Sequence, residues 1–242
     1  MKRKLSVFSM IAGHSLGRVF GILLLQILLN GLFFYDCLVT ESWDFLDLVL
    51  NSSDALGIFS IGLVLMTLLL GFVLRDKGGR QNCFLHRLSV SPRRICLEHG
   101  LYNSLCFLLL FSVEALCLLG GVFWHSLLKP EAYNHQSIML GCYNFSLLHT
   151  FFPLADWLGW VVLGVLILGL GFSTAAMSAA NRRGKRSVLP FLMLGTVLLY
   201  GHLQLSFQGV TLDGKIVSLL LALPFTVSAL WTLCRREVEE DE

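Results

Sequence analysis

The sequence predicts an all-α integral membrane protein, in which residues 1–242 form one transmembrane domain. We expect a bundle of six transmembrane helices with both chain termini in the cytoplasm. Hydrophobic residues make up 55% of the chain and charged residues only 14%, whereas a soluble domain carries about 25% charged residues. The Lys and Arg residues are also distributed very unevenly along the chain, and their positions predict which connections stay in the cytoplasm.

Six apolar segments are long enough to cross a bilayer, since about 20 residues rising about 1.5 Å each span about 30 Å of hydrocarbon. The first follows a short basic N-terminus, as a signal peptide would. It is too long for the apolar core of a signal peptide, however, and no A-x-A-like cleavage site follows it. We therefore expect it to be a span. The six predicted spans are 19–38, 55–74, 101–123, 157–176, 188–205 and 216–233.

Positive charge predicts the orientation of these spans, because short connections that cross the membrane contain few Lys and Arg residues. Of the 18 Lys and Arg residues, 16 lie in the N-terminal segment, the second and fourth connections and the C-terminal tail. Only Lys129 and Lys215 lie on the opposite side, and the first connection on that side is acidic. The sequence thus predicts a multi-pass cell-membrane protein, with cytoplasmic N- and C-termini.

Two cytoplasmic segments have helical patterns of their own. Between Leu5 and Val19 the apolar residues recur at helical spacing, which predicts a separate helix lying in the inner membrane interface before the first span. In the connection 75–100, Phe84 and Leu88 fall on one face of a short helix. The following Ser91-Pro92 pair is suited to the N-cap and first residue of a helix that continues into the third span.

This second segment is basic and partly apolar, so it suits either a groove on a soluble protein partner or the surface of anionic lipid. Its stretch R-L-S-V-S-P-R-R-I, residues 87–95, resembles the cytoplasmic coupling segment of ABC-2-type transporter permeases. The N-terminal interfacial helix and the six spans are similar to that family as well. In one respect the chain departs from the family, because only ten residues, 206–215, connect its last two spans, where the family commonly has a re-entrant hairpin.

The resemblance implies the membrane subunit of an ATP-driven exporter, which pairs with a second membrane half, identical or different. A separate cytoplasmic ATPase would bind ATP and dock on the coupling segment. We expect no enzymatic activity or cofactor for this chain itself, because its Gly184-Lys185-Arg186-Ser187 stretch lacks the upstream glycine of a P-loop. The formal net charge of +2 is too small to indicate a nucleic-acid partner. The residues that the resemblance assigns to ATPase docking are Phe84, Leu88, Arg93 and Arg94.

Three polar residues within the spans are candidates for a role in translocation. Asn30, Glu114 and His202 all lie about 17–21 Å from the cytoplasmic end of their spans, at about 1.5 Å per residue. A carboxylate at this depth costs several kcal/mol unless it is protonated or paired. We hypothesise that Glu114 faces the bundle interior, either protonated or paired with His202 or Asn30. A purely structural hydrogen bond between helices is an equally good interpretation.

The fourth predicted span contains the small-residue pairs Gly169 with Ser173 and Gly171 with Ala175, which predict close helix packing. A serine protease using Ser173 and His202 is disfavoured, because the two residues differ by about 10 Å in predicted depth.

We predict no metal site, because the seven cysteines lack metal-binding spacing. Cys37 and Cys142, both predicted near the outer face, could be bonded or separate. We expect the segment 124–156 to lie on the outer membrane surface as a loop, with short interfacial or re-entrant helices as the alternative. The alternative function is a six-helix membrane module that binds a small molecule in an uptake system.

Overall fold

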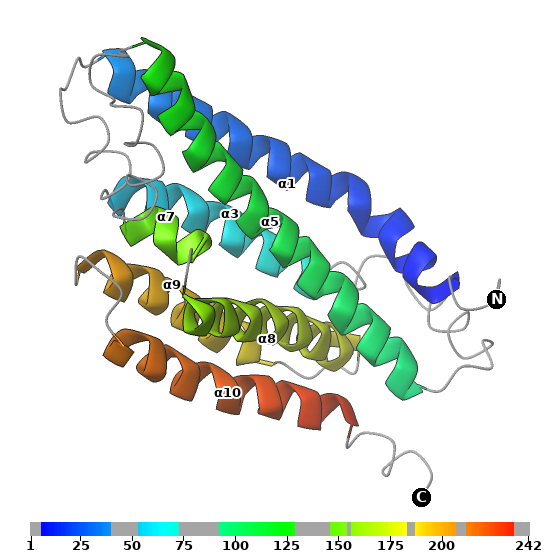
Figure 1. Ribbon diagram of the computed structural model, residues 1–242. Helices are drawn as coiled ribbons and strands as arrows, with labels where there is room; N and C mark the ends of the chain where they lie inside the picture. Colours follow the sequence, from blue (N-terminus) through cyan, green and yellow to red (C-terminus); the bar gives the residue numbers. More distant parts are fainter. Residues whose placement is uncertain are drawn as a thin grey trace, which may run out of the picture.

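The computed structural model describes residues 6–39, 53–72, 92–128, 146–153, 156–182, 187–206 and 212–234. These residues form seven α-helices (Figure 1). Six of the helices are long and apolar enough to cross a membrane, which confirms the predicted number of apolar helices. The helices are α1 (Ser6–Val39), α3 (Ser53–Phe72), α5 (Pro92–Leu128), α7 (Ser146–Phe151), α8 (Trp157–Arg182), α9 (Leu189–Ser206) and α10 (Leu212–Cys234).

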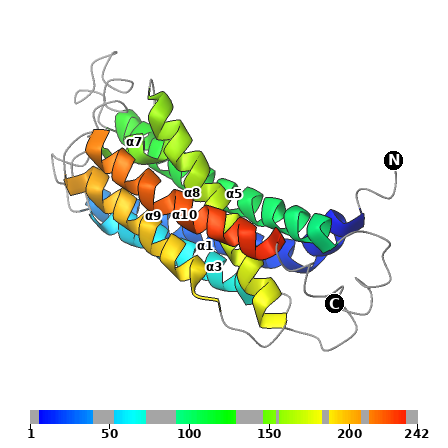
Figure 2. The same cartoon turned by 90° about the horizontal axis from the view of Figure 1, so that it is seen from below.

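The six long helices alternate in direction, so that α1 begins and α10 ends at the same end of the bundle (Figures 1 and 2). We call this end the terminal end. The opposite end, where α8 and α10 begin and where the short helix α7 lies, is the loop end. The charge distribution predicts that the terminal end faces the cytoplasm.

Helices α1 and α5 are longer than the hydrocarbon core requires. They contain 34 and 37 residues, which correspond to about 50 and 55 Å at 1.5 Å per residue, against about 30 Å of hydrocarbon. The expected separate interfacial helix is therefore wrong, because residues 6–18 continue into the span as the first turns of α1. A hydrogen bond of 2.6 Å between Ser15 Oγ and Tyr102 Oη holds these turns against α5.

Helix α8 is the centre of the bundle. Every residue from Gly169 to Ala180 is buried, and α8 packs on α5 and α10 over most of its length and on α3 and α9 as well. The predicted small residues make this possible. A Cβ on Gly171 would collide with the side chain and backbone nitrogen of Ser104 on α5, and one on Gly169 would collide with Met193 on α9 and Thr226 on α10.

The short helix α7 corrects the expectation that the segment 124–156 lies on the membrane surface as a loop. Leu147, Leu148 and Phe151 are buried, and the Phe151 ring stacks edge-on against Phe59 of α3 with centroids 4.7 Å apart. Helix α5 also runs on to Leu128, so the connection is shorter than predicted. The apolar side chains of α7 therefore contact the core of the bundle at its loop end.

The close approach of α5 and α8 can be tested at Gly171. Gly171→Ala should lower the free energy of unfolding by about 1–3 kcal/mol. The new methyl group would overlap the backbone of Ser104, which cannot move aside as the end of a flexible side chain can. Gly164→Ala on the same helix is the control. It meets nothing within 4 Å and should be neutral or slightly stabilising. Thermal unfolding in detergent measures both, and equal stability of the two variants would contradict the packing described.

Candidate functional site

A carboxylate hydrogen-bonded to two amides lies within the bundle, between α1 and α5. Glu114 on α5 is 0% exposed. Its Oε2 accepts hydrogen bonds from Gln26 Nε2 at 2.6 Å and from Asn30 Nδ2 at 2.8 Å, both on α1. Gln26 and Asn30 are four residues apart, so one face of α1 presents both amides to the same oxygen. We call these three residues the carboxylate cluster.

The neighbouring helix α3 is shaped around the carboxylate cluster. A Cβ on Gly62 would collide with Gln26 Oε1 in its present position, so the glycine leaves room for the amide as it is oriented here. Asn30 Nδ2 also donates to the Gln26 backbone oxygen at 3.1 Å, which fixes the orientation of its side chain. Three helices thus define the position of one carboxyl group in a part of the bundle where lipid supplies no alternative partner.

The carboxylate cluster keeps capacity for a further hydrogen bond. Among the described residues, Glu114 Oε1, Gln26 Oε1 and Asn30 Oδ1 are buried and accept no hydrogen bond. A carboxyl group with one oxygen held by two donors and the other oxygen open can accept a proton or a donor from a passing group without losing its fixed position. That chemistry suits a translocation role, and it is equally suited to fastening α1 to α5.

The structure brings together two of the three predicted intramembrane residues. Asn30 and Glu114 are in contact, as hypothesised. The alternative pairing of Glu114 with His202 is wrong, because His202 is exposed on α9 and turned away from the bundle interior. Ser173 is buried and donates to the Leu170 carbonyl at 3.0 Å, so it does not form a dyad with His202. Gln26 is a further member of this site that was not among the predicted candidates, although its spacing of four residues from Asn30 places both on one helix face.

Of the predicted docking residues, Arg93 and Arg94 belong to the first turn of α5, at the terminal end. Helix α5 begins at Pro92, as the Ser91-Pro92 pair predicted. Arg94 is exposed in the first turn and forms an ion pair of 2.8 Å with Glu98 one turn later. Arg93 lies in the same turn, but its side chain is outside the described part of the structure, as are Phe84 and Leu88. Cys142, the proposed partner of the buried Cys37, is also outside it.

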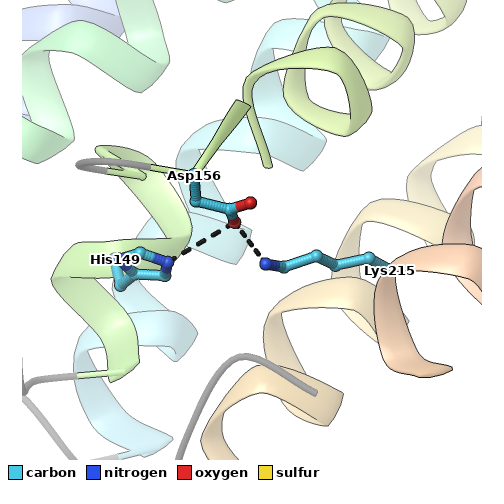
Figure 3. Close-up of polar contacts among 3 residues, drawn as sticks. All are labelled: His149, Asp156 and Lys215. Carbon is cyan, nitrogen blue, oxygen red and sulfur yellow. Dashed lines mark hydrogen bonds and ion pairs between the residues drawn. The ribbon is translucent and has the colours of Figure 1, made fainter. Parts of the chain in front are cut away.

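A second polar group, which the sequence analysis missed, lies at the loop end (Figure 3). Lys215, in the first turn of α10, has a side chain only 4% exposed and forms an ion pair with Asp156 Oδ2. His149 Nε2 on α7 lies 3.6 Å from the same oxygen, and its side chain is 7% exposed. We call His149, Asp156 and Lys215 the loop-end triad.

Asp156 is the fixed member of the triad because it also caps α8. Its side chain accepts a hydrogen bond from the backbone amide of Gly159, and its carbonyl accepts one from Trp160 at 3.3 Å, as expected of an N-cap residue. Burial favours the neutral acid, but the bonds from Lys215 and Gly159 outweigh burial and hold the pKa of Asp156 below its usual value. Burial lowers the pKa of His149, Asp156 opposes that shift, and Lys215 adds to it.

Comparison with known proteins gives no relative. No family model, curated protein or solved structure matches the chain.

The hydrogen bonds of the carboxylate cluster predict how two substitutions of Glu114 change the stability of the protein. Glu114→Leu should destabilise the protein by about 1–3 kcal/mol beyond the effect of Glu114→Gln, because it leaves the buried amides of Gln26 and Asn30 without an acceptor. The amide carbonyl that Glu114→Gln introduces can still accept two hydrogen bonds. Unfolding in detergent micelles compares the variants. Equal stability of the two would mean that these amides do not depend on Glu114.

Proposed function

We propose that this chain is the membrane-spanning permease subunit of an ATP-driven, ABC-type exporter. It would pair with a second membrane half and be energised by a separate cytoplasmic ATPase. The observation that supports this most is the start of α5 at Pro92, within the stretch 87–95 that resembles a coupling segment. A segment of this kind is useful only if a rigid element carries its movement into the membrane.

Helix α5 has the contacts that such an element needs. It runs unbroken for 37 residues from the coupling segment to the loop end. It packs on the central helix α8, and it holds α1 through the carboxylate cluster and through the hydrogen bond between Ser15 and Tyr102. A push on the first turn of α5 would therefore move α1 and α8 together. This is the rigid-body motion that alternating exposure of a substrate path requires.

The first turns of α1 and α5 would form the docking surface on this proposal. Both helices are longer than about 30 Å of hydrocarbon requires, and the bond between Ser15 and Tyr102 joins them near the terminal end. Arg94 points its charge outward there, with a side chain 47% exposed. A paired, basic helical projection of this kind suits an acidic or apolar groove on a soluble protein.

The docking proposal predicts the outcome of copurification. The chain expressed with its neighbouring genes should bring down an ATPase, and the double variant Arg93→Glu, Arg94→Glu should lose it, since charge reversal opposes a complementary surface.

The matched control is Arg235→Glu, Arg236→Glu, which makes the same charge change on the same predicted side and should retain the ATPase. Loss of the ATPase in both variants would mean that binding depends on the overall charge of the chain and not on the docking surface. If no ATPase is recovered and each monomer holds one bound small molecule, the exporter proposal is wrong and the small-molecule-binding module of an uptake system is favoured.

A further inference from the structure

The carboxylate cluster contains more hydrogen-bond acceptors than donors. Glu114 Oε2 accepts from Gln26 Nε2 and Asn30 Nδ2, but the other oxygen of Glu114 and the oxygens of both amides are buried without a partner. Glu114 and Asn30 are 0% exposed and Gln26 is 1% exposed, so the cluster is closed to bulk solvent. An acceptor that is buried without a donor costs free energy, and one added donor relieves part of that cost.

No counter-charge lies beside Glu114 within the part of the chain that the structure describes. On α5, Cys117 one turn further on senses the charge of Glu114, but a thiol stays neutral near neutral pH. Helix α8 has no ionisable side chain between Trp157 and Asn181, and Lys215 of α10 is paired at the loop end. The nearest described ionisable side chains of α1 and α3 lie at least about 7 Å from the cluster along the helix axes, at about 1.5 Å per residue: Arg18, Tyr35, Asp36 and Asp54.

The two amides of the cluster differ in how firmly they are oriented. Asn30 Nδ2 donates both to Glu114 Oε2 and to the backbone oxygen of Gln26, so its nitrogen must stay where it is. Gln26 Nε2 donates to Glu114, whereas Gln26 Oε1 faces Gly62 and has no partner. A half turn of the Gln26 amide exchanges its nitrogen and oxygen within nearly the same space. Gly62 has no side chain that would favour one of these atoms over the other.

We infer that Glu114 is a proton-binding site in which the Gln26 amide turns to suit both protonation states. With Glu114 ionised, both amides donate to Oε2, as in the structure. When a proton from water bonds to Oε2, the new hydroxyl donates to Gln26 Oε1 after the amide has turned, and it still accepts from Asn30. The proton leaves by the reverse steps. Both states keep two bonds between α1 and α5, so the site exchanges a proton without separating these helices. This activity goes beyond the proposed docking of an ATPase.

The two amides should therefore affect proton binding differently. Asn30 donates in both states, but its bond to the ionised carboxylate is charge-assisted and hence the stronger one. Asn30→Leu should raise the ratio of protonated to ionised Glu114 at a given pH by about fivefold to tenfold. Gln26→Met removes a partner of both states, so it should change this ratio by about twofold or less. If both amides were fixed donors, the two variants would change the ratio equally.

Infrared difference spectroscopy of the full-length protein in lipid nanodiscs measures this ratio during a pH titration. The carbonyl stretch of a neutral carboxylic acid is separate from the bands of a carboxylate. The Glu114 signal is the pH-dependent part of that stretch that Glu114→Gln lacks, since glutamine cannot ionise but keeps an acceptor in the cluster. The wild type should show the signal. Glu98→Gln is the matched control on the same helix, and it should retain the Glu114 signal.

Two results would overturn the inference. If no pH-dependent carboxyl signal depends on Glu114, this residue keeps one protonation state and only fastens α1 to α5. If Asn30→Leu and Gln26→Met change the ratio equally, Gln26 is a fixed donor and does not turn. If an amide variant does not fold, the comparison of the wild type with Glu114→Gln still decides whether the proton site exists. No ATPase takes part in this experiment, so its failure is distinct from a failure of the proposed docking.

Discussion

Lipid supplies the helices with neither hydrogen-bond partners nor counter-charges, and this constraint governs where polar side chains lie in the bundle. Several buried hydroxyl groups bond to a carbonyl of their own helix, as Thr67 and Ser104 do. A carboxylate cannot be satisfied in this way, because it needs a donor and the carbonyls of its own helix are acceptors. One oxygen of Glu114 therefore accepts hydrogen bonds from two amides of another helix, which hold α1 against α5 at that depth. Lys215 follows the same rule at the loop end, where it is buried against Asp156.

The two ends of the bundle differ in the way this constraint predicts. At the terminal end, α1 and α5 begin, and Arg94 in the first turn of α5 is exposed. At the loop end, the short helix α7 packs on aromatic rings, and Lys215 is buried in an ion pair with Asp156. Helices α5 and α8 connect the two ends through their shared interface. A docking event at the terminal end would thus act on a pair of packed helices that reaches the loop end.

The sequence predicted features that depend on local composition, and it missed those that depend on lateral neighbours. Hydropathy located six apolar helices, Pro92 marked the start of α5, and the glycines of α8 marked its tight interfaces. Depth alone placed Asn30 and His202 equally close to Glu114, because depth does not tell which face of a helix points inward. The ion pair of Asp156 and Lys215 joins residues 59 positions apart, and no periodicity signals such a pair. The burial of α7 depends likewise on rings supplied by α3 and α5.

The central claim is that the chain crosses the membrane six times with its basic connections, and hence its proposed docking surface, in the cytoplasm. Two native cysteines test this directly, since Cys83 lies in the basic second connection and Cys142 in the long outer segment. Intact cells treated with a mild reductant and a membrane-impermeant maleimide should label Cys142, and Cys83 should react only after permeabilisation. Labelling of Cys83 in intact cells would contradict the claim.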